Sequence, residues 1–285
     1  MTLRRSIAIL GTGYTGRHIW RLATQRSSSV LASSRRPEEH LTDVKPESRI
    51  RFDLADPTSW PALPSDIDLI WTFPAAPLEQ VEAWARRYAH PARTVVVLGS
   101  TSAYQMDGVG LEEKNPWIDE SSPLNRELAR VQGEEYLRQQ HGAIILRVAG
   151  IYGPGRNPVE WIRKGLVGPG DKYVNLIHVE DLAELCLLAL AAGRTGEIYN
   201  VSDGQPRRWR EICAEVSSRW GIVSSKPASE SEAGKRIMSR KLFDHVGYTL
   251  QHPNLYEALE ALQCHRRQSA RTGAAPTVPS PPLNA

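Results

Sequence analysis

The chain has 285 residues, 41% of them hydrophobic, and a formal net charge of +3 at pH 7. This length suffices for a large core, organised as one domain or as a domain with a smaller lobe. The charge is nearly balanced and the lysines and arginines are dispersed, which argues against a nucleic-acid-binding protein, and no apolar run is long enough to span a membrane.

The first predicted unit is a strand, a glycine motif and a helix near the N-terminus. The apolar run 7–10 leads into G-x-G-x-x-G and then into a helix-compatible segment. The first glycine permits a tight turn, the second lets the backbone approach a pyrophosphate, and the third lets helix and strand pack closely. Phosphates would lie at the helix N-terminus, where free N–H groups favour anions. We predict a dinucleotide site at Gly11, Thr12, Gly13, Tyr14, Thr15 and Gly16; an ordinary structural turn is the alternative.

Strand-like and helix-like segments then alternate along the chain. Strands are predicted at 30–34, 49–54, 67–73, 94–100, 143–148 and 196–201. Helices are predicted at 79–90, 127–140, 181–192, 209–220 and 253–262. The segment 94–100 contains a continuous β-branched run, which is typical of a parallel strand buried on both faces. Repeated strand–helix units predict an α/β fold with a doubly wound parallel sheet of the Rossmann type.

Regularity decreases after residue 150, where a Gly/Pro-rich segment leaves the predicted sheet. From about residue 266 the chain has almost no large apolar residues, which predicts a disordered tail over 266–285. The three cysteines, Cys186, Cys213 and Cys264, lack metal-ligand spacing, and the N-terminus lacks the apolar stretch of a signal peptide. We therefore expect a cytoplasmic protein without a metal site.

Several motifs, in order, carry a resemblance that runs from about residue 6 to 262. After the glycine motif come Asp53-Leu54, Gly99-Ser-Thr-Ser-Ala-Tyr104, Leu146-Arg-Val-Ala-Gly-Ile-Tyr-Gly-Pro-Gly155, Ile177-His-Val-Glu-Asp-Leu-Ala183 and Ile198-Tyr-Asn-Val201. Together they resemble the extended and atypical short-chain dehydrogenases/reductases, the NAD(P)-dependent epimerase/dehydratase-like group. The segment Lys241-Leu-Phe-Asp-His-Val-Gly-Tyr248 resembles the C-terminal region of the bacterial YeeZ-like subgroup.

The resemblance implies an NAD(P)-binding core and a smaller lobe that closes over the cofactor. We predict a Rossmann core of residues 1–149 completed by 176–202, and a C-terminal substrate-binding lobe of 150–175 with 203–265. In such folds the substrate binds at the carboxyl ends of the strands. Here that edge corresponds to Ser100, Tyr104, Val148 and Tyr152.

Cofactor choice depends on the residues after the second strand. NAD-specific proteins usually place a carboxylate there for the ribose diol, whereas NADP-specific proteins place a cation for the 2′-phosphate. This chain has Ser34-Arg35-Arg36 and no acid before Glu38. A guanidinium suits a phosphate, so we predict that the cofactor is NADP(H); NAD is the alternative cofactor. The alternative for Arg35 and Arg36 is that they are solvated loop residues without a ligand. In the resembling family, Asp53 and Leu54 would face the adenine, and Arg130 and Val148 would contribute to the same cofactor site.

The resemblance breaks at the catalytic motif. Members of this group carry Tyr-x-x-x-Lys on the helix after the fifth strand, where the lysine lowers the tyrosine pKa and the tyrosine relays a proton. None of the nine tyrosines here has lysine four residues later. Alignment through Glu134 puts Arg126 at the tyrosine position and Arg130 at the lysine position. Arginine at the second position keeps a positive charge, but arginine at the first cannot donate a proton near neutral pH.

Other residues are then candidates for catalysis and substrate binding. Ser100 matches the family hydroxyl that holds the reacting oxygen, and Tyr104 is the nearest substitute acid; capping and packing are their alternative roles. The predicted substrate-binding residues are Ser102, Arg126, Tyr152, Arg156 and His178, with a structural role as the alternative for His178 and surface exposure as the alternative for the arginines.

Three functions remain open. The first is an NADP-dependent oxidoreductase acting on a small carbonyl/alcohol or imine/amine pair. The second is an NADP-binding protein without redox turnover, as a sensor or assembly partner. The third is a sugar-nucleotide epimerase/dehydratase-like enzyme, against which the missing tyrosine counts. A small-molecule substrate is the expected partner; dimerisation is common in the group, but nothing in this chain requires it.

Overall fold

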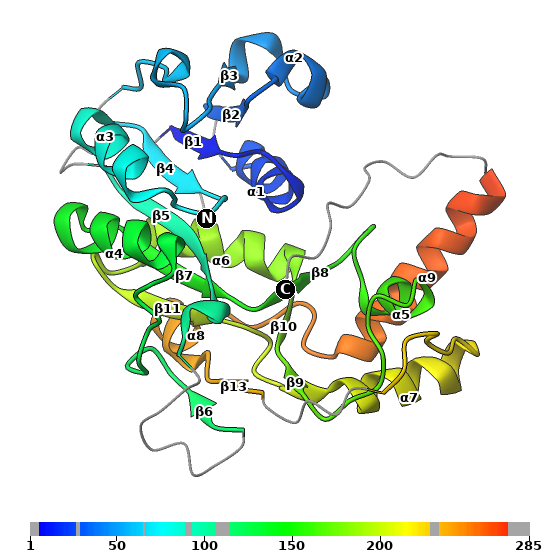
Figure 1. Cartoon of the computed structure of the whole chain (residues 1–285). Coiled ribbons are helices and arrows are strands. Elements are labelled where there is room, and N and C mark those ends of the chain that lie inside the picture. Colours follow the sequence, from blue (N-terminus) through cyan, green and yellow to red (C-terminus); the bar gives the residue numbers. More distant parts are fainter. Residues whose placement is uncertain are drawn as a thin grey trace.

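The computed structural model of the protein describes residues 6–26, 29–64, 66–88, 93–105, 115–228 and 234–272. Its centre is a parallel sheet with the strand order β11-β7-β5-β4-β1-β2-β3 (Figure 1). The strands are β1 (Ile7–Leu10), β2 (Val30–Ser34), β3 (Arg49–Arg51), β4 (Asp68–Trp71), β5 (Val95–Ser100), β7 (Ile144–Val148) and β11 (Ile198–Val201). The chain winds from β1 out to β3 and resumes at β4, on the other side of β1. The predicted doubly wound Rossmann fold is confirmed.

Helices cover both faces of this sheet. Helix α1 (Tyr14–Thr24) packs against α6 (Val179–Ala192) on one face, and α3 (Leu78–Tyr88) against α4 (Ala129–His141) on the other (Figure 1). The side chains of β1 alternate accordingly: Ile7 and Ile9 belong to the core on the α1/α6 side, and Ala8 and Leu10 to the core on the α3/α4 side. All four are buried, which explains why this strand is a continuous apolar run.

A smaller lobe with its own apolar core lies beyond the carboxyl ends of the strands (Figure 1). Its helices are α5 (Pro158–Arg163), α7 (Trp209–Trp220) and α9 (Leu255–Thr272). Its short strands pair as β8 (Gly150–Tyr152) with β10 (Leu176–His178), and as β9 (Tyr173–Val174) with β12 (Arg207–Arg208). Two further strands, β6 (Trp117–Ile118) and β13 (Arg236–Ile237), pair with each other, and α8 (Arg240–Val246) packs beside β11. The predicted core segment 176–202 therefore begins with a strand, β10, that pairs outside the central sheet.

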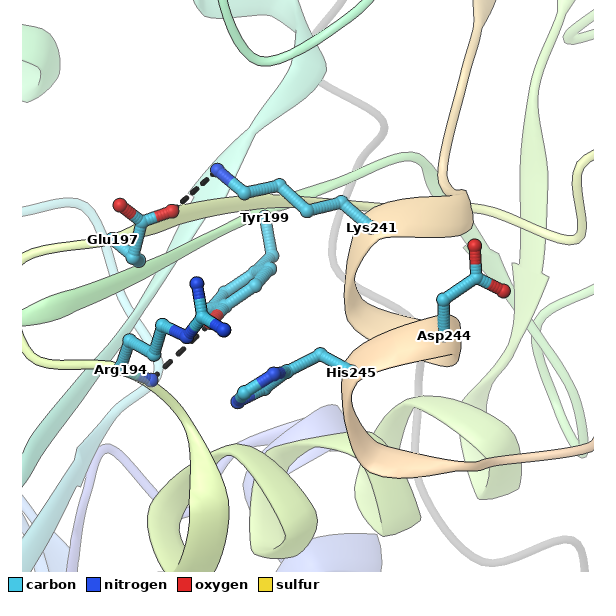
Figure 2. A pocket seen from close by; sticks show the side chains of 6 residues that line it. All are labelled: Arg194, Glu197, Tyr199, Lys241, Asp244 and His245. Atoms are coloured by element: carbon cyan, nitrogen blue, oxygen red, sulfur yellow. Dashed lines mark hydrogen bonds and ion pairs between the residues drawn. The ribbon is translucent and has the colours of Figure 1, made fainter.

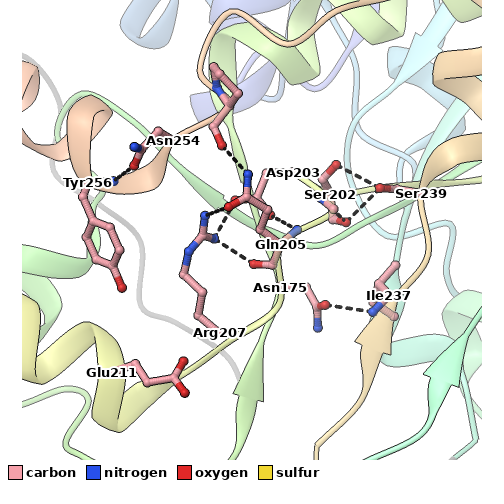
Figure 3. A network of polar contacts seen from close by, with 12 residues as sticks. Asn175, Ser202, Asp203, Gln205, Arg207, Glu211, Ile237, Ser239, Asn254 and Tyr256 are labelled. Atoms are coloured by element: carbon pink, nitrogen blue, oxygen red, sulfur yellow. Dashed lines mark hydrogen bonds and ion pairs between the residues drawn. The ribbon is translucent and has the colours of Figure 1, made fainter.

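A polar network ties the end of β11 to this lobe (Figure 3). Arg207 Nη1 donates to Asp203 Oδ2 at 2.7 Å, and the Gln205 N–H donates to the other carboxylate oxygen at 3.0 Å. The hydroxyls of Ser202 and Ser239 lie 3.1 Å apart. Burial raises the pKa of Asp203, and Arg207 opposes that shift. The carboxylate thus holds the turn from β11 to β12 in one conformation.

Most predicted elements agree with the structure to within a few residues, and two helix ends show how such differences arise. Helix α4 begins at Ala129 rather than 127, because the Asn125 side chain accepts the Glu127 N–H at 3.0 Å in a turn that precedes the helix. Helix α9 runs on to Thr272, past the predicted start of the tail at 266. Arg266 pairs there with Glu160 of α5, and arginine is a good helix former. Residues 273–285 lie outside the described part of the chain.

Candidate functional site

The carboxyl ends of three neighbouring strands meet at a cavity of about 170 Å³. Residues following β4, residues at the ends of β5 and β7, and helices α1 and α4 contribute to its wall. The lining residues are Thr15, Thr72, Phe73, Pro74, Leu98, Gly99, Arg130, Glu134, Val148 and Ile151. Three of them, Thr15, Arg130 and Val148, were predicted cofactor ligands, and the structure brings them together. The cavity lies at the point where the winding of the sheet reverses, which is where such sheets bind ligands.

The glycine turn that borders this cavity has the geometry predicted for it. Gly11 has φ +91°, and a Cβ there would lie 2.8 Å from the Thr72 and Phe73 side chains. A Cβ on Gly16 would lie 2.5 Å from the carbonyl oxygen of Gly11, so only glycine allows helix and strand to approach this closely. A Cβ on Gly13, in contrast, would meet nothing within 4 Å. Gly13 is also the N-cap of α1, and no side chain caps the first turn. The turn is therefore open, with uncapped N–H groups at a helix N-terminus.

Two hydrogen bonds fix the end of β2 to this turn. The Gly11 N–H donates to Ser33 Oγ at 2.8 Å, and the Ser33 N–H donates to Thr12 Oγ1 at 3.0 Å. Ser33 is fully buried, so it aligns the two segments rather than meeting a ligand. The sequence analysis did not single out this role.

The next three residues, Ser34, Arg35 and Arg36, differ in whether their side chains already contact other residues of the chain. The Ser34 hydroxyl lies 2.9 Å from His40 Nδ1, and Arg36 forms an exposed ion pair with Glu39 at 2.9 Å. Arg35 is exposed, and its guanidinium contacts no partner among the described residues. Asp53 and Leu54 follow β3, which pairs with β2; Asp53 Oδ1 accepts the Ala55 N–H, and Leu54 is buried in the α3/α4-side core. Of these candidates, Arg35 is the cation free to bind a ligand.

A buried ion pair forms the wall on the α4 side. Arg147 Nη1 and Glu134 Oε2 lie 2.7 Å apart, and both side chains are almost completely buried. Burial raises the pKa of Glu134, and Arg147 is the main group that opposes the shift. A Cβ on Gly99 would lie 2.9 Å from the Glu134 carboxylate oxygens, so the glycine of β5 makes room for this pair. Arg130, one turn before Glu134, also lines the cavity and forms no ion pair with a described residue.

Arg126, the residue aligned with the family tyrosine, lies away from the cavity. It precedes the first residue of α4, is exposed, and engages Gln132 only through its backbone carbonyl oxygen. The helix face that borders the cavity is formed by Arg130 and Glu134, which are four residues apart. The structure therefore places a cation and a carboxylate, rather than a tyrosine and a lysine, on the helix beside the cavity.

Ser100 ends β5 directly after the cavity residue Gly99, and it is paired in register with Val148. Its Oγ accepts the Ser102 N–H at 3.2 Å and the Ser102 hydroxyl at 3.0 Å, and it caps the short turn Thr101–Ala103. These contacts correspond to the capping role that was the alternative for Ser100. In both of them the Ser100 oxygen accepts a hydrogen bond. The Ser100 O–H remains available as a donor.

Tyr104 is in a packed environment. It is 2% exposed, and its hydroxyl donates to Asn200 Oδ1 at 2.7 Å. Burial raises its pKa, and the Arg147 guanidinium above the ring only partly offsets this. A phenol with a raised pKa and an occupied hydrogen bond is a poor proton donor to a ligand. Its contacts favour the packing role that was the alternative in the sequence analysis.

The other predicted substrate-binding residues, Tyr152, Arg156 and His178, lie near Tyr14 of the glycine turn. The Tyr152 ring makes an edge contact with His178 (5.1 Å between centroids), and the Arg156 guanidinium lies 5.9 Å from the centre of the Tyr14 ring. His178 is 3% exposed, and its Nδ1 accepts the Glu180 N–H at 3.3 Å as the N-cap of α6. Burial and the neighbouring His252 lower the His178 pKa. The hydroxyls of Tyr14 and Tyr152 and the Nε of Arg156 are buried without a hydrogen-bond partner among the described residues.

A larger hollow, of about 400 Å³, lies beside the opposite end of β11 (Figure 2). Several of its polar groups are already paired: Lys241 with Glu197 at 2.5 Å, and His245 with the Ala192 carbonyl oxygen at 2.8 Å. The Tyr199 hydroxyl accepts the Arg194 N–H at 3.2 Å. None of the predicted site residues lines it, and we regard the smaller cavity as the candidate site.

Sequence comparison finds a family model and a curated relative that match part of the chain. Residues 78–202 match the model of the NAD dependent epimerase/dehydratase family. Protein YeeZ of Escherichia coli K12 is 28% identical over 173 residues, which cover 58% of this chain and 61% of YeeZ. The resemblance to epimerase/dehydratase-like and YeeZ-like proteins predicted from the motifs is confirmed.

Solved structures agree in fold. MoeE5 in complex with UDP-glucose and NAD has a TM-score of 0.68 at 17% identity, over 92% of this chain and 99% of MoeE5. The human epimerase family protein SDR39U1 with NADPH has a TM-score of 0.67 at 18% identity, over 90% and 98% of the two chains. Within the described residues, no helix combines the length and the apolar character needed to cross a membrane.

Two contributions to the cavity were not predicted from the sequence. Thr72, Phe73 and Pro74 follow β4, next to β1; the predicted strand closed by a proline was the signal that could have located them. Glu134 was used only to align the helix. Its four-residue spacing from Arg130 could have indicated that both face the same side.

Proposed function

We propose that the protein is an NADP-dependent oxidoreductase of the atypical short-chain type, acting on a small carbonyl/alcohol or imine/amine substrate. The observation that carries the proposal is the junction of the open glycine turn with the cavity at the ends of β4, β5 and β7. The space beside Gly13 and the uncapped N-terminus of α1 fit a pyrophosphate. A nicotinamide, when bound, supplies or accepts the hydride. The NAD and NADPH complexes of similar folds support this class of cofactor.

Each of the chain's own residues has a distinct part in this proposal. Arg35 is exposed, lies next to Ser34, has no ion-pair partner within the described ranges, and would hold a 2′-phosphate. Arg130 presents a positive charge to the cavity, and the buried Glu134–Arg147 pair fixes the helix that carries it. The Ser100 hydroxyl would donate to the reacting oxygen. Among the described lining residues there is no tyrosine or lysine, so a bound water would carry the proton.

Titration of the purified chain with NADPH and NADH tests the cofactor assignment. We expect NADPH to bind more tightly, and Arg35→Ala to weaken NADPH at least about tenfold while leaving NADH unchanged, because a charge-assisted contact is lost. Arg86→Ala, which removes an exposed arginine of α3, is the matched control and should change neither affinity. Equal weakening of both nucleotides by Arg35→Ala would contradict the phosphate contact. Absence of binding by either nucleotide would overturn the whole proposal.

The second candidate function is NADP binding without redox turnover. The exclusion of Tyr104 from the cavity and the exposed position of Arg126 favour it. Among the described lining residues no tyrosine or lysine replaces the missing tyrosine, and the one carboxyl group, Glu134, is already paired with Arg147. Ser100→Ala separates the two functions once a carbonyl or imine substrate has been found by screening. An oxidoreductase should lose about 10²-fold in kcat, as for removal of one donor to a reacting oxygen, and keep its NADPH affinity. Ser218→Ala, at an exposed position of α7, is the control. A substrate screen without turnover, alongside tight NADPH binding, would favour the second function.

A further inference from the structure

Three side chains with metal-ligating atoms converge outside the cavity, beside the N-terminus of α6. His178 ends β10, Glu180 lies in the first turn of α6, and His252 lies in the segment before α9. His252 Nε2 is 2.8 Å from Glu180 Oε2, and His178 Nδ1 is 3.9 Å from the same oxygen. One ligating atom from each residue fits within a span of 4.8 Å. Two imidazole nitrogens and one carboxylate oxygen thus lie close enough together to share one ion.

The surrounding contacts hold these donors in place. The fully buried carboxylate of Asp181 accepts the Gln251 N–H at 2.7 Å, the His252 N–H at 3.1 Å and the Tyr248 hydroxyl at 2.7 Å. The backbone that carries His252 is therefore fixed against the first turn of α6. His178 is 3% exposed, and its ring lies 3.7 Å from that of His252, centroid to centroid. Little conformational freedom would be lost if a ligand bound all three.

We propose that His178, Glu180 and His252 form a site for a divalent transition-metal ion of the Zn²⁺ class. Imidazole nitrogens and a carboxylate oxygen are the ligands that this class prefers. Ligand atoms about 2.0–2.1 Å from a tetrahedral ion lie roughly 3.3 Å from one another. The present separations of 2.8 and 3.9 Å bracket that spacing, so small side-chain rotations complete the site. Nδ1 of His178 is unprotonated, and its lone pair accepts the Glu180 N–H at 3.3 Å; the ion would take the place of this long hydrogen bond.

The open side of the cluster can admit the remaining ligand. The Glu180 side chain is 49% exposed and that of His252 is 27% exposed, so water can complete the coordination. None of the three residues lines the candidate cavity, and the ion would instead join α6 to the segment that leads into α9. Its role is to fix the lobe to the core. No metal site was predicted from the sequence, where the spacing of the cysteines was the ground. His252 is 72 residues from Glu180, so this cluster has no local spacing that could have indicated it.

The test is metal titration of the full chain after removal of bound metal by a chelator. We expect one Zn²⁺ per chain by calorimetry, and a Co²⁺ derivative whose visible spectrum is that of a four-coordinate site. His252→Ala should weaken Zn²⁺ at least about 100-fold, because it removes one of three protein ligands. Zn²⁺ should raise the Tm of the unmodified chain by several degrees and leave that of His252→Ala unchanged.

Controls remove other groups that could bind the ion. Cys264→Ser removes an exposed thiol, and His245→Ala removes a histidine that is hydrogen-bonded to the Ala192 carbonyl oxygen and stacked on Tyr199; both should bind Zn²⁺ like the unmodified chain. Glu180→Gln tests the carboxylate without removing volume and should also weaken binding. No Zn²⁺ binding at micromolar concentration, or binding unchanged in both His252→Ala and Glu180→Gln, would overturn the proposal. Nucleotide titration of the same samples keeps this result separate from that of the proposed function.

Discussion

The two sides of the cavity differ in how they are built. On the β1–α1 side, backbone geometry makes the site: a turn at positive φ, a close helix–strand contact at Gly16 and open space at Gly13. On the β5–α4 side, side chains make it: the Glu134–Arg147 pair, Arg130 and the Ser100 hydroxyl. Backbone sites depend on glycine and helix position, whereas side-chain sites depend on helix register. The first side can keep its ligand while the second changes its chemistry.

The largest expected effect is a loss of stability when the buried ion pair on the α4 side of the cavity is removed. Arg147→Met leaves the buried Glu134 carboxylate without its partner and should lower the free energy of unfolding by about 3–5 kcal/mol. Burial already raises the Glu134 pKa, so the loss should be smaller at pH 5 than at pH 8, because the carboxyl is then more often neutral. Denaturant unfolding at the two pH values measures both quantities.

A matched control for that pair lies on the same helix. Arg138 pairs with Glu135 at 2.7 Å, but its side chain is 26% exposed. Arg138→Met should cost no more than about 1 kcal/mol, because water screens and replaces the contact. Similar losses from Arg147→Met and Arg138→Met would contradict the view that burial makes the Glu134–Arg147 pair special.

The second prediction separates packing from ligand binding on the glycine side. Gly16→Ala places a methyl 2.5 Å from the Gly11 carbonyl oxygen and should cost about 1–3 kcal/mol of stability. Gly13→Ala meets open space and should change stability by less than about 1 kcal/mol. If the turn holds a pyrophosphate, Gly13→Ala should nevertheless weaken NADPH at least about tenfold. Thermal unfolding and nucleotide titration of the two variants provide the comparison, and unchanged NADPH binding by Gly13→Ala would contradict the assignment of the turn.

The contrast between backbone geometry and side-chain contacts also explains what could be predicted from the sequence. Strand 30–34 and helix 209–220 were predicted at their observed bounds, because apolar periodicity and breakers define them. The geometry at Gly11 and Gly16 followed from the motif. The position of Arg126 did not, because the Asn125 side chain delays the start of α4, and such local competition leaves no periodic pattern. The burial of Tyr104 depends on Asn200, which is 96 residues away, and the His178–Glu180–His252 cluster likewise depends on tertiary contacts.

The smallest expected effect concerns Lys235, whose Nζ donates to the carbonyl oxygen of Tyr104 at 3.3 Å, next to the β5 side of the site. Burial, reinforced by Lys172, lowers its pKa to about 8. Below pH 8 this lysine is protonated in both states, and the folded chain bears the cost of burying the charge. Between about pH 8 and 10.5 the unfolded chain binds the extra proton, so stability rises with pH through that window. Lys235→Met should therefore raise Tm by roughly 2 °C at pH 7 and lose this advantage near pH 10.

Lys226, an exposed lysine that donates to the Leu166 carbonyl oxygen at 3.2 Å, is the matched control: Lys226→Met should leave Tm unchanged at both pH values. A Tm gain for Lys235→Met that is the same at pH 7 and pH 10 would show that apolar packing, rather than relief of a buried charge, is its cause.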